Sequence, residues 1–402
     1  MKTLMNKDAL VEIVDDNCPS CDWAPMSVLY KIAQVPAHSV LLFSNRDDAL
    51  AYPRGDITLG FCPACGFITN IVFDQSLNEY SQRYEATQSC SSTFNSFHQR
   101  LASHLIEKYN LRGKDIIEIG CGQGEFLTLL CDLGGNRGLG FDPTYRNGTI
   151  DLANGLSFVN DFYSEKYSHK KSDFLCCKMT LEHIDRTAEF VNMVRRSVGK
   201  QLDSLIFFQV PSVERILREL AFWDIYYEHC SYFSKGSLVR LFLHCGFNII
   251  DLWQDYDDQY LMLVAKPAKT KHQGLPAEAN DLEHLSREAR YFASNCANKI
   301  DEWKRRIKTN FAKSHKVVLW GSSSKSVGFL TTLDIKEEIQ YVVDINPNRQ
   351  GTFMAGTGQE IVSPDFLQEY KPDSVIVMNP VYYNEIKQTL SRMSLAPKIM
   401  TV

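Results

Sequence analysis

The sequence predicts an α/β protein with a large Rossmann-like domain, a second and smaller Rossmann-like domain at the C-terminal end, and a cysteine-containing module before both. Apolar strands alternate with helical patterns between residues 95 and 266, and the alternation returns between residues 316 and 402. Such alternation is typical of parallel sheets covered by helices. Two Cys-x-x-Cys pairs lie before residue 75. A length of 402 residues also favours two or three domains over one.

The composition argues against several classes of protein. A net charge of −5 and an isoelectric point of about 6.1 predict no general attraction to nucleic acids or anionic membranes. No stretch approaches the roughly 18 apolar residues that span a bilayer, and the N-terminus lacks the apolar run of a secretory signal. Twelve cysteines, several of them in apolar runs, suit reduced thiols better than a disulfide framework. We expect a cytoplasmic protein that acts on a small molecule, as a monomer or a homo-oligomer.

Residues 1–75 form the first predicted unit, a small module with few strands. It carries two cysteine pairs, Cys18 with Cys21 and Cys62 with Cys65. Cys-x-x-Cys turns let two thiolates converge on one ion, and four thiolates satisfy tetrahedral zinc. The gap between the pairs is longer than in common zinc ribbons, so hairpins are expected between them. We predict structural zinc, with a redox dithiol or unpaired cysteines as the alternatives.

Residues 76–266 form the largest predicted domain. Its apolar strands are expected at 115–119, 138–141, 173–177, 205–210 and 260–265, in a parallel sheet. Residues 267–313 are predicted to be a linker followed by one long amphipathic helix, because positions 280–313 lack glycine and repeat apolar residues at helical spacing. Residues 314–402 form the smaller domain, with strands expected at 316–320, 341–344 and 374–378.

A glycine-rich loop follows the first strand of the large domain. Its glycines are Gly120, Gly122 and Gly124, and Glu118 lies two residues before the first of them. The spacing differs from the dinucleotide pattern G-x-G-x-x-G. It lets an uncharged nucleoside lie close to the backbone, and Glu118 can attract an ammonium and a sulfonium group. The loop resembles the S-adenosylmethionine loop of class I methyltransferases; a purely structural tight turn is the alternative.

Two aspartates farther along the chain fit the same interpretation. Asp142 closes the next strand, about 20 residues after the loop, where an acidic side chain can accept hydrogen bonds from ribose hydroxyls. Asp161 resembles the acidic residue that meets the adenine amino group in that family. The alternatives are a turn residue for Asp142 and a helix cap for Asp161.

Two segments rich in histidine follow the ends of later strands. Residues 179–185 contain a Glu-His pair that ends in His183, and residues 222–234 contain the sequence Tyr-Tyr-Glu-His that ends in His229. Open α/β sheets bind their ligands at the carboxyl ends of the strands. We therefore expect His183 and His229 to face one pocket.

The chain as a whole resembles the sugar C-methyltransferases of deoxysugar biosynthesis. The resemblance rests on the two cysteine pairs, the Glu-His pair, the turn Y-x-E-H-x-x-Y-F-S at 226–234, and the C-terminal sequences W-G-S-S-S-K at 320–325 and V-D-I-N-P at 343–347, in this order. It implies methylation of C-3 of a nucleotide-linked 4-keto-deoxysugar. The doubled tyrosine at 226–227 departs from the family pattern, so another small natural-product intermediate is the closest alternative substrate.

The resemblance also implies roles for individual residues. Deprotonation must precede methylation of carbon, so we assign His229 as the general base and Glu228 as a residue that could orient it. Tyr226 is the expected donor to the enolate oxygen. His183 is expected to bind the sugar or relay a proton. The family places a further tyrosine between the zinc module and the first strand of the large domain, for which Tyr84 is favoured over Tyr80.

Further substrate contacts are expected from both Rossmann-like domains. The candidates are Tyr227, Tyr232, Ser322 and Lys325. The tyrosines could instead be core aromatics with satisfied hydroxyl groups. The loop at 321–328 joins a strand to a helix, so Ser322 and Lys325 could approach a pyrophosphate or brace the domain interface. From other classes, a zinc-containing protein that binds or modifies RNA and a scaffold with an inactive methyltransferase domain are the rival hypotheses.

Overall fold

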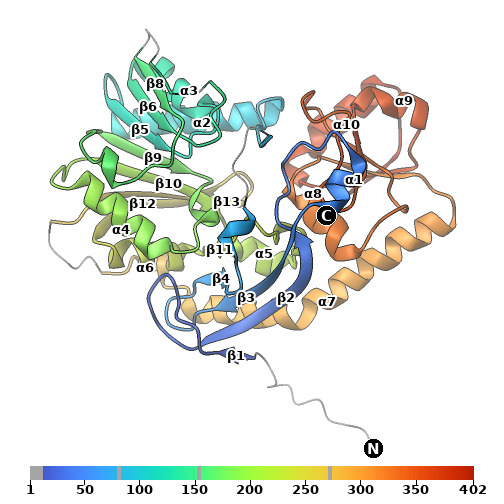
Figure 1. The fold of residues 1–402 in the computed structure, drawn as a ribbon, viewed down its shortest axis with the longest axis horizontal. Helices are drawn as coiled ribbons and strands as arrows, with labels where there is room; N and C mark the ends of the chain where they lie inside the picture. Colours follow the sequence, from blue (N-terminus) through green and yellow to red (C-terminus); the bar gives the residue numbers. More distant parts are fainter. Residues whose placement is uncertain (1–11, 79–82, 148, 152–154, 270–273) are drawn as a thin grey trace, which may run out of the picture.

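The computed structural model describes residues 12–78, 83–147, 149–151, 155–269 and 274–402. Two α/β lobes stand side by side, and the strands of the N-terminal module lie below and between them (Figure 1). Each lobe contains one of the Rossmann-like sheets expected from the sequence. No helix in the described ranges has both the length and the apolar character needed to cross a membrane.

The N-terminal module is an antiparallel sheet and contains more strands than the sequence predicts. It is made of β1 (Ile13–Val14), β2 (Met26–Pro36), β3 (Arg54–Phe61) and β4 (Ile68–Asn70), with α1 (Arg46–Ala51) and η1 (Gln75–Leu77) at its edges. A fifth strand, β11 (Ser231–Tyr232), comes from the large domain and pairs Tyr232 with Ile68 of β4. This pairing ties the segment that carries His229 to the module.

The central sheet has the strand order β12-β13-β10-β9-β5-β6-β8-β7. Its parallel part is β8 (Leu156–Val159), β6 (Arg137–Phe141), β5 (Asp115–Ile119), β9 (Phe174–Lys178) and β10 (Leu205–Pro211), which confirms four of the expected strands. β13 (Tyr260–Pro267) was expected to be parallel, and this is wrong. It is antiparallel because it returns from β12 (Phe247–Asp255) through a tight hairpin. β7 (Ile150–Asp151) adds a short edge.

Helices cover both faces of this sheet, as buried strands require. They are α2 (Ser92–Tyr109), α3 (Glu125–Gly134), α4 (Thr187–Val198) and α6 (Lys235–His244), whereas the buried residues of α5 (Val213–Glu219) pack with the N-terminal module. Short 3-10 turns lie in the connections, at η2 (Glu165–Tyr167), η3 (Leu181–His183) and η4 (Phe222–Asp224). The last two turns introduce the segments that carry His183 and His229.

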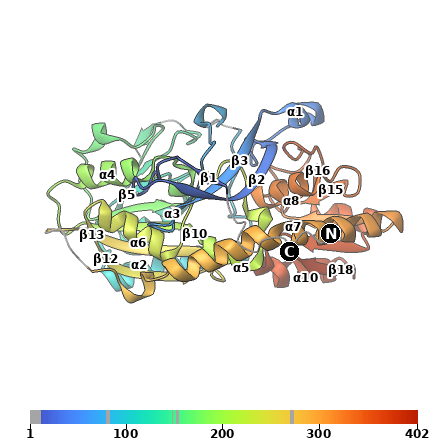
Figure 2. The same cartoon turned by 90° about the horizontal axis from the view of Figure 1, so that it is seen from below.

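The long helix expected after the linker is α7 (Leu282–Ala312), preceded by η5 (Ala277–Ala279). Its apolar stripe is buried, and it packs against α5 of the large domain and against α8 of the C-terminal domain. Figure 2 shows this helix running along both lobes. The helix therefore packs against both domains and holds them together, and it is not a flexible linker.

The C-terminal domain has a fully parallel sheet in the order β16-β15-β14-β17-β18. The strands are β14 (Val317–Trp320), β15 (Tyr341–Val343), β16 (Glu360–Val362), β17 (Ser374–Val377) and β18 (Lys398–Thr401), and the helical elements are α8 (Ser324–Leu333), η6 (Pro364–Phe366), α9 (Leu367–Tyr370), η7 (Pro380–Tyr382) and α10 (Tyr383–Arg392). α8 packs on η4 so closely that a Cβ at Gly328 would lie 2.8 Å from the carbonyl oxygen of Trp223. The smaller domain is therefore seated directly beside the His229 segment.

Candidate active site

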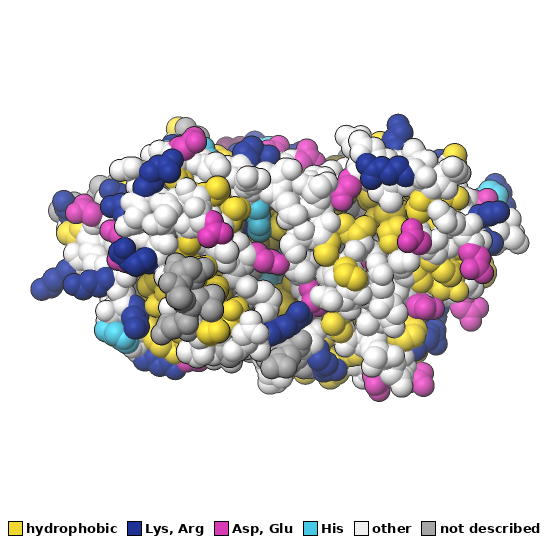
Figure 3. All heavy atoms as spheres, turned by 90° about the horizontal axis from the view of Figure 1, so that it is seen from above, with side chains coloured by type: hydrophobic (Ala, Val, Ile, Leu, Met, Phe, Trp, Pro, Cys, Tyr) yellow, Lys and Arg dark blue, Asp and Glu magenta, His cyan; other side chains and the backbone are white. Residues whose placement is uncertain are grey.

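Two adjoining cavities lie at the carboxyl ends of the central strands. The first, of about 290 Å³, surrounds the glycine loop after β5. The second, of about 310 Å³, lies between the central sheet and the C-terminal domain. Tyr84, Met179, His183 and Tyr260 line both cavities, so the two meet at these side chains. Figure 3 shows a hollow between the lobes in which histidine and acidic side chains are visible.

The glycine loop lines the first cavity, and close packing explains why glycine occupies two of its positions. A Cβ at Gly120 would lie 2.0 Å from Oγ1 of Thr180, and one at Gly124 would lie 2.3 Å from the ring of Phe158. Both residues also adopt positive φ angles, of 70° and 85°. At Gly122 no atom lies within 4 Å of the Cβ position, so the backbone there is open. A flat ligand could therefore lie against the loop.

The acidic residues expected at the cofactor all line this first cavity. Glu118 is buried, and its Oε2 has no hydrogen-bond partner. Burial raises the pKa of Glu118 to about 7. Asp142 accepts hydrogen bonds from the backbone N–H groups of Gly122 (2.8 Å) and Thr144 (2.7 Å), so it also shapes the loop. Asp161 accepts a hydrogen bond from the hydroxyl of Tyr167 (2.6 Å).

His183, Tyr226 and His229 come together in the second cavity, where His183 also reaches the first, so the two histidines face one pocket as expected. The hydroxyl of Tyr226 lies 3.2 Å from Nε2 of His229, and the rings of His183 and His229 meet edge to face at 4.8 Å. Burial lowers the pKa of His229 well below its ordinary value, and the neighbouring His183 acts in the same direction. Burial likewise lowers the pKa of His183 to about 4. Both imidazoles are therefore neutral at pH 7 and can accept a proton.

Glu228 lines the second cavity but does not bond to His229. Its Oε1 accepts hydrogen bonds from the backbone N–H (2.8 Å) and the hydroxyl (2.7 Å) of Ser39, and it lies 3.1 Å from Nδ1 of His38. The sequence suggested that Glu228 orients His229. In the structure it instead holds the loop after β2 against the wall of the cavity.

Glu182 is a site residue for which sequence reasoning assigned no role. It is 1% exposed, and neither carboxylate oxygen has a hydrogen-bond partner. Burial raises the pKa of Glu182 to about 8, so the side chain is largely protonated at neutral pH. Donor atoms of Glu182, His183 and His229 lie within 4.8 Å of one another. The Glu-His pair at 182–183 was the available signal, but only its histidine was given a role.

Three of the expected substrate contacts are structural instead. The hydroxyl of Tyr227 accepts a hydrogen bond from the backbone N–H of Asp74 (2.9 Å) and donates one to its carbonyl (3.2 Å), because the side chain points away from that of Tyr226. Tyr232 is buried in the core beneath β4. Ser322 is fully buried, and both its N–H and its hydroxyl donate to Asp344. None of the three lines either cavity.

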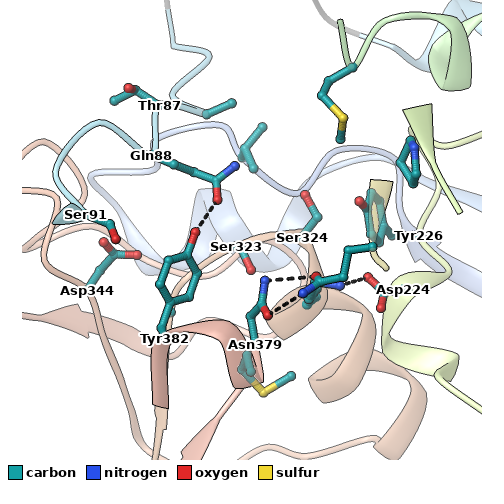
Figure 4. A pocket seen from close by; sticks show the side chains of 18 of the residues that line it. Thr87, Gln88, Ser91, Asp224, Tyr226, Ser323, Ser324, Asp344, Asn379 and Tyr382 are labelled. Carbon is teal, nitrogen blue, oxygen red and sulfur yellow. Dashed lines mark hydrogen bonds and ion pairs between the residues drawn. The ribbon is translucent and has the colours of Figure 1, made fainter. Parts of the chain in front are cut away.

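The wall opposite His229 comes from the C-terminal domain and the segment before α2. Ser323 and Ser324 face the cavity, as does Asp224 (Figure 4), which forms a partly buried ion pair with Lys325. Tyr382 donates a hydrogen bond to Gln88 (2.7 Å), and the amides of Gln259 and Asn379 bond to each other at 3.0 and 3.1 Å. Tyr84 lies where it was expected, whereas Tyr80 is outside the described residues.

The four cysteines of the N-terminal module converge. Sγ of Cys18 lies 3.7 Å from that of Cys65, Sγ of Cys21 lies 3.6 Å from that of Cys62, and all four lie within 4.8 Å of one another. All twelve cysteines fall in the described ranges, and none forms a disulfide. The cluster is compatible with zinc.

Two known families match successive parts of the chain. Residues 94–252 match the family of the methyltransferase domain, and residues 270–396 match that of the C-methyltransferase C-terminal domain. The chain is 24% identical over 388 residues to C-methyltransferase NovU of Streptomyces niveus, an alignment that covers 92% of this chain and 91% of that protein.

Solved structures resemble part of the chain. Magnesium protoporphyrin IX methyltransferase from Synechocystis, with bound SAH, is 12% identical and aligns over 44% of this chain and 84% of that one, with a TM-score of 0.35. Human N-acetylserotonin methyltransferase in complex with SAM is 13% identical and aligns over 43% and 55% of the two chains, also with a TM-score of 0.35.

Proposed function

Since the chain is an S-adenosylmethionine-dependent methyltransferase that ends in a C-methyltransferase domain, we propose that it methylates a carbon next to a ketone, namely C-3 of a nucleotide-linked 4-keto-deoxysugar. One observation carries the proposal. A buried, neutral His229 lies within hydrogen-bonding distance of Tyr226 in the second cavity, against His183, which lines both cavities. His229 can act as the base that removes a carbon-bound hydrogen, and Tyr226 can donate a hydrogen bond to the neighbouring ketone oxygen.

Each side chain around His229 has a different role in the proposed reaction. Nε2 of His229 takes the proton from the carbon, and the hydroxyl of Tyr226 donates a hydrogen bond to the oxygen that becomes negative. His183 lines both cavities, so it is placed to contact the substrate near the reacting carbon. Neutral Glu182 also lines the second cavity and adds no negative charge that would oppose the enolate. When bound, S-adenosylmethionine supplies an electrophilic methyl group at its sulfonium.

The first cavity fits this cofactor. The open backbone at Gly122 can receive the nucleoside, and Asp142 and Asp161 line the cavity near the loop. The buried carboxylate oxygen of Glu118 without a partner is suited to the ammonium group of the methionine part.

The second cavity fits a nucleotide sugar. Ser323 and Ser324 lie at the N-terminus of α8, a ten-residue helix whose free N–H groups and dipole favour an anion such as a diphosphate. Lys325 and Arg215 also line this cavity, but Asp224 and Glu219 form ion pairs with them, so the N-terminus of α8 is the feature that favours an anion. Gln259 and Asn379 also line this cavity, and their amide groups can hydrogen-bond to sugar or base groups.

The cysteine cluster fits structural zinc. Zn–S bonds of about 2.3 Å in a tetrahedron separate the sulfurs by about 3.8 Å, close to the 3.6 and 3.7 Å found for the two closest pairs. Four thiolates complete the coordination of the ion, so the metal has no open position for substrate. Its role is to hold the two cysteine turns together.

A substrate panel tests the proposed function. The protein, incubated with S-adenosylmethionine, is expected to methylate nucleoside diphosphate 4-keto-6-deoxysugars, with the new methyl group on C-3 in the NMR spectrum of the product. The free 4-keto sugar without its nucleotide should react poorly, because it leaves the anion site at α8 empty. Methylation of an unrelated keto acid but of no nucleotide sugar, or of oxygen instead of carbon, would refute the assignment.

Tyr226 and Tyr227 offer a matched pair of substitutions. Tyr226→Phe is expected to lower kcat by about 100-fold, the usual cost of losing one donor to a developing oxyanion. Tyr227→Phe should leave kcat unchanged and lower the free energy of unfolding by about 1 kcal/mol, because only its bonds to Asp74 are lost. Initial rates and denaturant unfolding measure both effects. Equal rates for the two variants would remove Tyr226 from the mechanism.

A further inference from the structure

Lys178 is a buried cation at the cofactor cavity to which neither the sequence motifs nor the mechanism assigns a role. It is the last residue of β9, beside β5, the strand that carries Glu118. It is 8% exposed and lines the same cavity as Glu118 and the glycine loop. Lysine is seldom buried without a partner, because removing an ammonium from water is costly. The position therefore needs a group that compensates the charge.

The protein holds this ammonium in place without neutralising it. Nζ of Lys178 lies 3.1 Å from Nε2 of His98 on α2 and 3.4 Å from the ring centroid of Phe126 on α3. Burial and the charge of Lys178 lower the pKa of His98 to about 2, so His98 is neutral and accepts a hydrogen bond from the ammonium. Lys178 forms no ion pair with any carboxylate in the described ranges, although several other lysines do. N–H donors therefore remain for a ligand.

Glu118 provides the opposite charge in the same cavity. Its Oε2 is buried without a hydrogen-bond partner, and the positive charge of Lys178 opposes the rise that burial causes in its pKa. The two side chains influence each other electrostatically but form no direct ion pair among the described contacts. A ligand that carries both an ammonium and a carboxylate, as an α-amino acid does, would satisfy both at once.

We propose that Lys178, held by His98, binds the α-carboxylate of the methionine part of S-adenosylmethionine, while Glu118 faces its ammonium group. Met179, which lines both cavities, follows Lys178 directly in the chain. Fixing the amino-acid end beside β9 therefore places the rest of the cofactor close to the junction of the cavities. The inference rests on the cofactor and is independent of the proposed sugar substrate.

Binding of two cofactor analogues to the full-length protein tests the proposal by titration calorimetry. S-adenosylhomocysteine has the amino-acid part, and 5′-methylthioadenosine lacks it. Lys178→Met keeps an apolar chain against Phe126 and removes the charge, so it is expected to weaken S-adenosylhomocysteine roughly 10- to 100-fold, as for a lost charge-assisted hydrogen bond. Affinity for 5′-methylthioadenosine should change less than about twofold. Lys170→Met, at an exposed surface lysine, should change neither affinity.

Two further measurements make the result decisive. His98→Leu removes the acceptor that holds Lys178 and is expected to weaken S-adenosylhomocysteine alone, by a smaller factor than Lys178→Met. The unmodified protein should bind decarboxylated S-adenosylmethionine roughly 10-fold or more weakly than S-adenosylmethionine, a comparison that needs no variant. Unchanged affinity for S-adenosylhomocysteine in Lys178→Met, equal losses for both analogues, or equal binding of the decarboxylated cofactor would overturn the proposal. The sugar assignment would survive any of these outcomes.

Discussion

Replacing His229 with asparagine is expected to lower kcat by about 100- to 10,000-fold, the range that a general base contributes. Asparagine keeps a polar group near Tyr226 but cannot take up a proton. His229 lines the second cavity and not the cofactor cavity, so affinity for S-adenosylhomocysteine should stay within about twofold. Single-turnover rates and titration calorimetry measure the two quantities. His169→Asn is the control variant, because His169 is exposed and lines neither cavity.

The pH dependence of the wild-type protein gives a second readout of the same residue. The base must be neutral to act, and burial lowers the pKa of His229 well below the ordinary value for histidine. A lowered pKa keeps the imidazole neutral at lower pH. With S-adenosylmethionine saturating, so that protonation of Glu118 does not limit binding, kcat should therefore remain level as the pH falls from 7 through 6.5 and decline only below that. A decline centred near pH 6.5 or above, or a variant His229→Asn with normal turnover, would contradict its role as base.

Replacing Cys62 with serine is expected to abolish zinc binding and to unfold the N-terminal module. Structural zinc contributes about 10 to 16 kcal/mol in small zinc domains, which is comparable to the whole net stability of a typical folded domain. The damage should reach the active site, because β4 of this module pairs with β11 and Ser39 bonds to Glu228. Zinc content by mass spectrometry and thermal unfolding measure the effect, and methyl transfer should be lost with it.

Cys90→Ser is the matched control for zinc content and unfolding, since Cys90 is exposed and outside the cysteine cluster. This variant should retain one zinc ion per chain and the wild-type melting temperature. A Cys62→Ser protein that keeps its metal, or that melts like the wild type after the metal is removed, would show that the cluster is not a structural zinc site.

The central and C-terminal sheets were largely predictable because their strands are buried on both faces. Such strands read as short continuous apolar runs, and β5, β9, β14 and β17 all lie within a residue or two of the expected positions. The strands of the N-terminal module were harder to foresee. β2 is long but largely half-buried or exposed along its middle, and β11 has only two residues. The pairing of β11 with β4 joins segments far apart in the sequence, which no local pattern encodes.

The active site was predictable where a motif fixes the backbone and less so where side-chain direction matters. Glu118, the glycine loop and the pair Tyr226 and His229 lie where the motifs place them. Spacing alone could not tell which way Tyr227 points, because residues 226–229 form a turn, where side chains follow neither the helix nor the strand period. The bond between Gln259 and Asn379 joins loops of different domains and is visible only once the chain has folded.

The most direct measurement of the central claim is hydrogen exchange at the substrate carbon. In D₂O, with S-adenosylhomocysteine in the cofactor cavity, the protein should replace the hydrogen at C-3 of a nucleotide-linked 4-keto-deoxysugar by deuterium, as seen by NMR, and His229→Asn should not. Exchange at an unchanged rate in the His229→Asn protein, or methylation by the wild type with no exchange under any condition, would contradict the assignment of this imidazole as the group that removes the proton.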